Sequence, residues 1–202
     1  MSEGLKTYAV NIGKDPVAAN NFHFVKNASH ELELRKGMEG DGGAVVTTLF
    51  ASGTKQLLQA VVTQTGAVVT GSTILPYDDT IPQITEGDEY MTVSITPKKI
   101  GSTLDISSMF HGSSTAGSIQ SIALFSDSNA NALAAHAIQP FTATAIFSLG
   151  LGHQMTTTSL STITFRIRCG NNVAGTTTMN GIGGNRRFGG VSSSFLSVKE
   201  YY

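Results

Sequence analysis

Apolar and polar residues alternate in short runs along most of the chain, from residue 56 to residue 202. The clearest run, residues 90–96 (YMTVSIT), places Met91, Val93 and Ile95 on one face and stops at Pro97. Strict alternation over a few residues is typical of a half-buried β-strand. Residues 104–110 and 162–169 alternate in the same way, and further short runs rich in apolar or β-branched residues lie in 57–69, 119–125, 141–149, 176–179 and 191–199. We therefore expect an all-β domain, either a sandwich or a jelly roll.

Residues 130–138 are the one helical alternative, because they are rich in alanine. The run is short, and Pro140 prevents a helix from continuing beyond it. The chain also lacks a repeat of fixed period, which argues against a solenoid or a propeller. The all-β prediction is therefore kept for the whole of residues 56–202.

The first 55 residues differ in composition, because they contain many charged residues of both signs. A Ser/Gly turn at residues 51–55 ends this segment. Phe22 and Phe24, and then Leu32 and Leu34, alternate with polar neighbours, which predicts short strands. A segment so short and so poor in apolar residues cannot hold a core of its own. We expect residues 1–55 to be a short β or extended anchoring segment that packs on a neighbouring subunit or a larger assembly.

Composition and charge exclude several partners. The 202 residues include 13 Lys and Arg against 14 Asp and Glu, a net charge of -1, whereas a nucleic-acid-binding surface needs a basic excess. The first ten residues lack the basic and apolar regions of a secretory signal. His136, Gln139 and Pro140 interrupt the longest apolar stretch, which makes it a poor membrane span. We expect no nucleic-acid partner, no membrane insertion and no ordinary secretion signal.

One run carries charge on a strand face. In residues 162–169, Arg166 and Arg168 share a face with threonines, while Cys169 lies on the opposite, apolar face. The arginine pair is either solvated or placed to meet acidic groups across a subunit interface, where arginine forks are favoured. The candidate acidic partners are Asp78, Asp79, Glu86, Asp88 and Glu89, which otherwise belong to an exposed loop.

Motifs for catalysis and for metal binding are missing from the sequence. The five histidines are scattered without metal-ligand spacing, and no G-x-S-x-G elbow occurs. Cys169 is the single cysteine, so it forms no intrachain disulfide and is expected to pack as a small hydrophobe. The acidic residues 78–89 could offer oxygen ligands to calcium or a carboxylate pair to a glycosidase, but their prolines and glycine favour a solvated loop. We expect no enzyme activity, no catalytic or metal-binding residues and no cofactor.

Several strings of the sequence together resemble a known module. They are residues 71–97 (GSTILPYDDTIPQITEGDEYMTVSITP), 123–125 (ALF), 164–169 (TFRIRC) and 187–200 (RFGGVSSSFLSVKE). As a set they resemble a module found in tailed-phage and prophage proteins, often at the end of fibre or spike chains. That module is similar to the C1q/TNF type of trimeric jelly roll, and the match covers roughly residues 56–202.

The resemblance implies a homotrimeric fibre, spike or head-decoration protein, made in the host cytoplasm and assembled into the virion. It implies that residues 1–55 anchor the chain to other virion proteins of the capsid or the tail. The head would then be displayed outward for attachment to a host-surface glycan or receptor. The alternative is a purely structural capsid-shell or cement subunit that binds no host molecule.

The candidate contact surface is the glycine-rich loop of residues 180–190 (NGIGGNRRFGG). In a jelly roll, the last strand returns toward the point where the chain enters, so this loop would lie at the far end of the head. Arg186, Arg187 and Phe188 combine charge with an aromatic face, which suits sugars or acidic glycans. A structural hairpin, whose glycines serve the turns, is the alternative.

Overall fold

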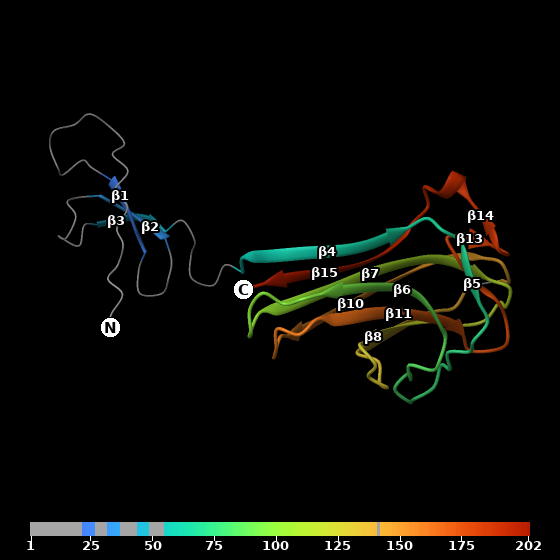
Figure 1. The fold of residues 1–202 in the computed structure, drawn as a ribbon. Coiled ribbons are helices and arrows are strands. Elements are labelled where there is room, and N and C mark those ends of the chain that lie inside the picture. The colour runs from blue at the N-terminus through green and yellow to red at the C-terminus, as the bar shows by residue number, and fades with distance from the viewer. Residues whose placement is uncertain (1–21, 27–31, 37–43, 49–54, 141) are drawn as a thin grey trace. The chain divides into compact units, whose positions relative to one another are not determined.

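The computed structural model describes residues 22–26, 32–36, 44–48, 55–140 and 142–202, and the chain divides into two units, Met1–Lys55 and Gln56–Tyr202 (Figure 1). In the first unit, strands β1 (Phe22–Lys26), β2 (Leu32–Lys36) and β3 (Ala44–Thr48) form an antiparallel sheet in the order β1-β2-β3. The two strands expected here are confirmed, whereas β3 was not foreseen. The expected turn before residue 55 lies outside the described residues, and the anchoring role stays a prediction.

The second unit, called the head below, is built from strands and one short 3-10 turn, η2 (Phe188–Gly190). The all-β prediction is confirmed. Even within the alanine-rich run, residues 134–138 form a strand, because pairing with a neighbouring strand outweighs the helix propensity of alanine. The strands are β4 (Leu57–Thr65), β5 (Val69–Gly71), β6 (Asp88–Ile95), β7 (Thr103–Ser114), β8 (Gln120–Ser126), β9 (Ala134–Ile138), β10 (Ile146–Thr156), β11 (Ile163–Asn171), β12 (Thr177–Met179), β13 (Gly181–Ile182), β14 (Asn185–Arg186) and β15 (Ser194–Tyr201).

The strand pairing of the head is nested from its two ends inward. The first strand, β4, pairs with the last, β15; β6 pairs with β11, β7 with β10, and β8 with β9, all antiparallel. Further pairing of β15 with β7 and of β11 with β8 joins them into two sheets. Sheet 1 contains β4-β15-β7-β10 with the short β12 and β5, and sheet 2 is β6-β11-β8-β9. This nesting is that of a C1q/TNF-like jelly roll, so the fold that the resemblance implies is confirmed.

The core lies between the two sheets and is centred on Phe110 of β7, which is fully buried. Its ring meets Tyr90 edge-on at 5.1 Å between centroids and stacks on Phe147 at 6.0 Å. Cys169 and the other apolar residues of its strand face are buried, as the alternation predicted. The sequence predicts that Phe110, Phe147, Phe165 and Phe195 fill the core, and this prediction is wrong for Phe195. Phe195 alternates with the buried Leu196 on β15 and therefore lies on the outer face of sheet 1.

Strand β7 runs past the residues His111 to Ser113, where the sequence predicted its end, because its second half pairs with both β10 and β12. Gly112 is needed inside this strand, since a Cβ there would lie 2.7 Å from a ring carbon of Phe110 and from the Thr178 backbone oxygen. Strand β10 also begins later than predicted, at Ile146. Gly112 is therefore a place where Phe110 and Thr178 pack closely against the strand backbone, and it does not end the strand.

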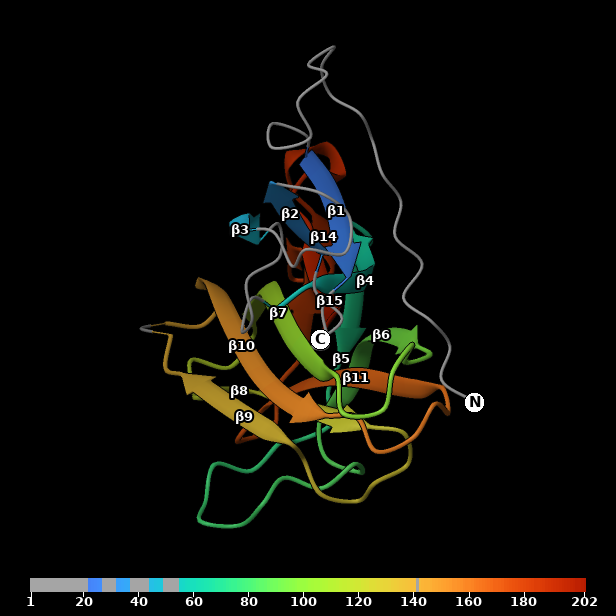
Figure 2. The same cartoon turned by 90° about the vertical axis from the view of Figure 1, so that its left-hand side faces the viewer.

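The long connection between β5 and β6, residues 72–87, runs along the outside of sheet 2 (Figure 2). Its Leu75 is fully buried in a second small core with Ala123 and Phe125 of β8. Strand β8 is therefore buried on both faces. We call residues 72–87 the covering loop. Within the described part of the chain, no helix is long and apolar enough to cross a membrane.

Candidate functional site

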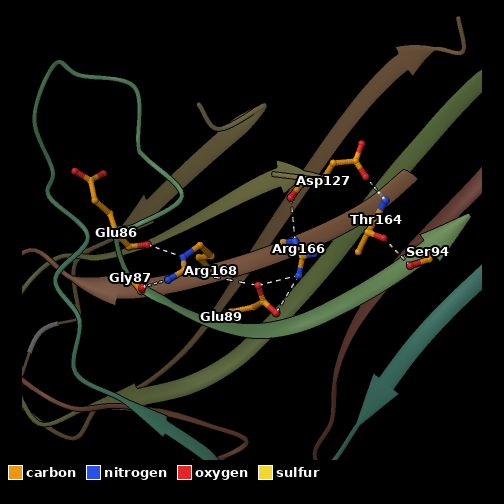
Figure 3. Close-up of polar contacts among 8 residues, drawn as sticks. All are labelled: Glu86, Gly87, Glu89, Ser94, Asp127, Thr164, Arg166 and Arg168. Atoms are coloured by element: carbon orange, nitrogen blue, oxygen red, sulfur yellow. Dashed lines mark hydrogen bonds and ion pairs between the residues drawn. The ribbon is translucent and has the colours of Figure 1, made fainter. Parts of the chain in front are cut away.

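Arg166 and Arg168 lie on the outer face of β11, and both are engaged within the chain (Figure 3). Arg166 forms an ion pair with Glu89 of β6, with 3.2 Å between Nη1 and Oε2, and its Nε donates to the Asp127 backbone oxygen at 3.0 Å. Arg168 donates to two backbone oxygens at the end of the covering loop, from Nε to Glu86 at 2.8 Å and from Nη2 to Gly87 at 2.6 Å. Arg168 thus fastens the covering loop to sheet 2. A role of the two arginines between subunits stays a prediction.

The acidic residues Asp78, Glu86 and Asp88, in the covering loop and in β6, each accept hydrogen bonds from different groups. Asp78 accepts hydrogen bonds from the hydroxyl and the backbone N–H of Thr80, at 2.5 and 2.9 Å, and these bonds lower the pKa of its carboxyl. Glu86 and Asp88 accept backbone N–H groups of the loop itself, each at 2.8 Å. Among the described residues, no three His, Cys, Asp or Glu side chains are grouped so that they could hold a metal ion.

The loop of Arg186, Arg187 and Phe188 lies at the end of the head opposite Gln56 and Tyr202 (Figure 1). Gln56 and Tyr202 exchange two backbone hydrogen bonds, at 2.8 and 2.9 Å, so the last strand returns to the point where the chain enters. Both arginines are exposed, and Phe188 is 77% exposed at a positive φ of 49°. An exposed aromatic ring at a strained backbone position is compatible with contact to a ligand. That contact stays a prediction.

The outer face of sheet 1 has small side chains at its centre. Ser197 of β15, Ser107 of β7 and Gly152 of β10 lie opposite one another in register. Next to this row, Phe195 pairs with Met109. Exposed apolar side chains occur at both edges of the face, at Val62 of β4 (64% exposed) and at Ile146 of β10 (64% exposed).

A hollow lies between the covering loop and strand β9. It has two adjoining parts of about 310 and 170 Å³, which share Asp78, Thr80, Pro82 and Ala135. The loop forms one wall, and residues of β8 and β9 form the floor. The segments that meet here are far apart in the sequence, so only the folded chain brings them together.

Cys169 is completely buried, and this burial raises the pKa of its thiol far above the ordinary value of 9.0. The thiolate is the reactive form of cysteine, so the folded protein is expected to react with an aromatic disulfide reagent slower than free cysteine by a factor on the order of a thousand. Absorbance of the released thiol measures this rate, and unfolding in urea should restore full reactivity. Fast labelling of the folded chain would contradict the buried position.

No family model and no curated protein matches the chain. Among solved structures, the Eiger TNF of S. frugiperda superposes with a TM-score of 0.40 at 11% identity, over 70% of this chain and 92% of that one. A chain of the infectious bursal disease virus Gx strain superposes with a TM-score of 0.34 at 13% identity, over 90% of this chain and 46% of that one. The enzymatically active domain of tailspike protein 4 of bacteriophage CBA120 superposes with a TM-score of 0.26 at 18% identity, over 61% of this chain and 19% of that one. Likenesses this weak carry no argument, so the jelly-roll assignment rests on the strand pairing.

Proposed function

We propose that the chain is a virion structural protein, a homotrimeric fibre, spike or head-decoration protein that attaches to a host-surface glycan or receptor. In this proposal residues 56–202 are the displayed head, and residues 1–55 are the anchor on the particle. The jelly-roll topology and the sequence strings that resemble phage head modules support it. The observation that carries it is the outer face of sheet 1.

Glycine on β10 is the strongest sign that another chain approaches this face. A Cβ at Gly150 would make only ordinary contacts, at 3.6 Å or more, and one at Gly152 would meet a single atom at 3.9 Å. Neither glycine has a positive φ. Nothing within the single chain therefore requires glycine at these positions, although glycine weakens a strand. A second backbone packed closely against the strand gives the missing reason.

The apolar side chains around this strip fit the same interpretation. A strip of small residues, with Met109 and Phe195 beside it and Val62 at its edge, resembles an interface between subunits more than a solvated strand face. Asp105 and Lys199 lie opposite each other on the same face, so it also carries balanced charge. Self-association through this face would bury these groups without leaving a net charge.

The experiment is the native mass of the full chain by light scattering, for the natural sequence and for Gly152→Arg. We expect the natural chain at three times its mass of 21.2 kDa and the Gly152→Arg variant at the mass of one chain, because a long charged side chain there blocks close approach. The matched control is Ser94→Arg, at an exposed position on the outer face of sheet 2. It should remain trimeric.

A natural chain that is monomeric would contradict the trimeric head, and the capsid-shell or cement alternative would then be favoured. A loss of the trimer in both variants would show that added charge, and not the position, is responsible. Binding separates the two functions, because an attachment head should bind intact host cells. A cement subunit should instead bind empty shells and raise their stability.

A further inference from the structure

Hydrogen bonds within the chain hold the walls of the hollow beside β9 in place without a ligand. Leu75 N–H donates to the Asn171 backbone oxygen at 2.9 Å, and Ala132 N–H donates to the Pro82 oxygen at 2.9 Å. Together with Arg168, these bonds attach the covering loop to sheet 2 at both ends. A preformed site of this kind binds a ligand without an ordering cost.

The floor of the hollow contains a polar group without a partner. Ser121 lies opposite Ala137 in the β8–β9 pair, so it shares its face with Ala123 and Ala135. Ser121 is 4% exposed and lines the smaller part of the hollow, and its Oγ has no hydrogen-bond partner. A buried hydroxyl without a partner is costly, but neighbouring atoms cover this oxygen, so the hollow offers the surface around Ser121 and not its hydroxyl to a ligand.

The walls and the rim combine an aromatic ring, an apolar side chain and two carboxylates. Tyr77 is 63% exposed and Ile81 is 55% exposed, so both present apolar surface to a ligand. Asp78 uses one oxygen in its turn with Thr80, while Asp79 has no hydrogen-bond or ion-pair partner among the described residues. Carboxylate oxygens accept hydrogen bonds from hydroxyl groups.

We propose that this hollow binds a neutral sugar, whose ring lies against Tyr77 and whose hydroxyl groups hydrogen-bond to Asp79. A sugar ring has an apolar C–H face and hydroxyl groups at its edge, which match the aromatic wall and the oxygens. No Lys or Arg is among the described residues that line the hollow, so an acidic sugar would meet two carboxylates without compensation. The proposal deepens the attachment part of the proposed function and names a surface other than the Arg186–Phe188 loop.

The test is saturation-transfer NMR of the full chain with separate millimolar samples of glucose, galactose, mannose, rhamnose and N-acetylglucosamine, and with sialic acid and choline as charged probes. We expect transfer to at least one neutral sugar and none to sialic acid. For that sugar, Tyr77→Ala should weaken binding by about tenfold. Asp79→Asn, which keeps the size of the side chain, should weaken it several-fold, and Ser121→Ala should leave it unchanged because the Ser121 hydroxyl is covered.

Two control variants separate this site from the rest of the surface. Tyr202→Ala removes another exposed tyrosine and Phe188→Ala removes the exposed ring of the far loop, and neither should change the affinity. The proposal is overturned if no neutral sugar binds, if only sialic acid or choline binds, or if Tyr77→Ala and Asp79→Asn leave binding unchanged. If a monomeric protein binds sugar, this inference is supported and the trimeric head is contradicted. If the protein is a trimer that binds no sugar, the trimeric head is supported and this inference is contradicted.

Discussion

Replacing Glu200 by alanine is expected to lower the free energy of unfolding of the head by about 3 kcal/mol. The Glu200 side chain is fully buried on β15. Its carboxylate accepts hydrogen bonds from the Ser102 hydroxyl at 2.6 Å, from the backbone N–H of Lys98 at 3.0 Å and from the Gln59 amide at 2.6 Å. Alanine would remove this shared acceptor, and the Ser102 hydroxyl, which belongs to a fully buried residue, would lose its shortest hydrogen bond. Urea unfolding followed by circular dichroism measures the loss.

The same carboxylate makes the stability depend on pH. Burial alone would raise the pKa of Glu200, but the hydrogen bonds from Ser102, Lys98, Gln59 and Lys99 outweigh it and hold the pKa below the ordinary value of 4.5. The stabilisation is therefore complete above pH 4.5 and is lost as the pH falls through the lower pKa of the folded state. Glu200→Gln, which keeps the size and one acceptor oxygen, should lose about 1 kcal/mol at neutral pH. The gap between the natural chain and Glu200→Gln should shrink in acid; a gap that is constant with pH would contradict this account.

Gly170→Ala is expected to cost about 2 kcal/mol of stability and to displace the covering loop. A Cβ at Gly170 would lie 2.6 Å from the backbone oxygen of Thr73 and 3.0 Å from the backbone nitrogen of Leu75. Backbone atoms cannot move aside as the end of a flexible side chain can, so the loop itself must shift. Because this loop is one wall of the hollow, neutral-sugar binding should be lost with it.

Gly152→Ala is the matched control for this substitution, because its Cβ has free space within the chain. It should change the stability of the monomeric head by less than about 0.5 kcal/mol, since alanine suits a strand at least as well as glycine does. Both variants are compared by urea unfolding under conditions in which the natural chain is a single subunit. Equal losses at Gly170 and Gly152 would show that the close approach of the covering loop is not the cause.

Alternation predicted the strands well where one face is buried and the other is solvated, as in β6 and β11. Alternation could not say which face of β15 is inside, because Phe195 lies on one face while Leu196 and Val198 lie on the other. Strand β8 gave a continuous apolar run because it is buried on both faces, under the core and under the covering loop.

The hollow could not be predicted, because its walls come from residues 75–82 and 132–137, which only the nested pairing brings together. One signal was nevertheless present in the sequence, the run from Tyr77 to Asp79, which joins an aromatic residue to two acids. The partner of Arg166 was among the acidic candidates, but the sequence could not show that Glu89 belongs to the adjacent strand of the same chain.

The pairing of β4 with β15 also determines how the head would bear mechanical load. Gln56 lies at one end of this pair, beside Tyr202, while the Arg186–Phe188 loop leads into β15 at the other end. A force applied between these two ends is directed along the strands. It therefore loads in shear all the hydrogen bonds between β4 and β15, from the pair Leu57 and Tyr201 to the pair Thr65 and Ser194, and these bonds share the force. A hairpin pulled apart from one end would instead lose its bonds one at a time. The first and last strands of the head are thus arranged to resist tension along its long axis.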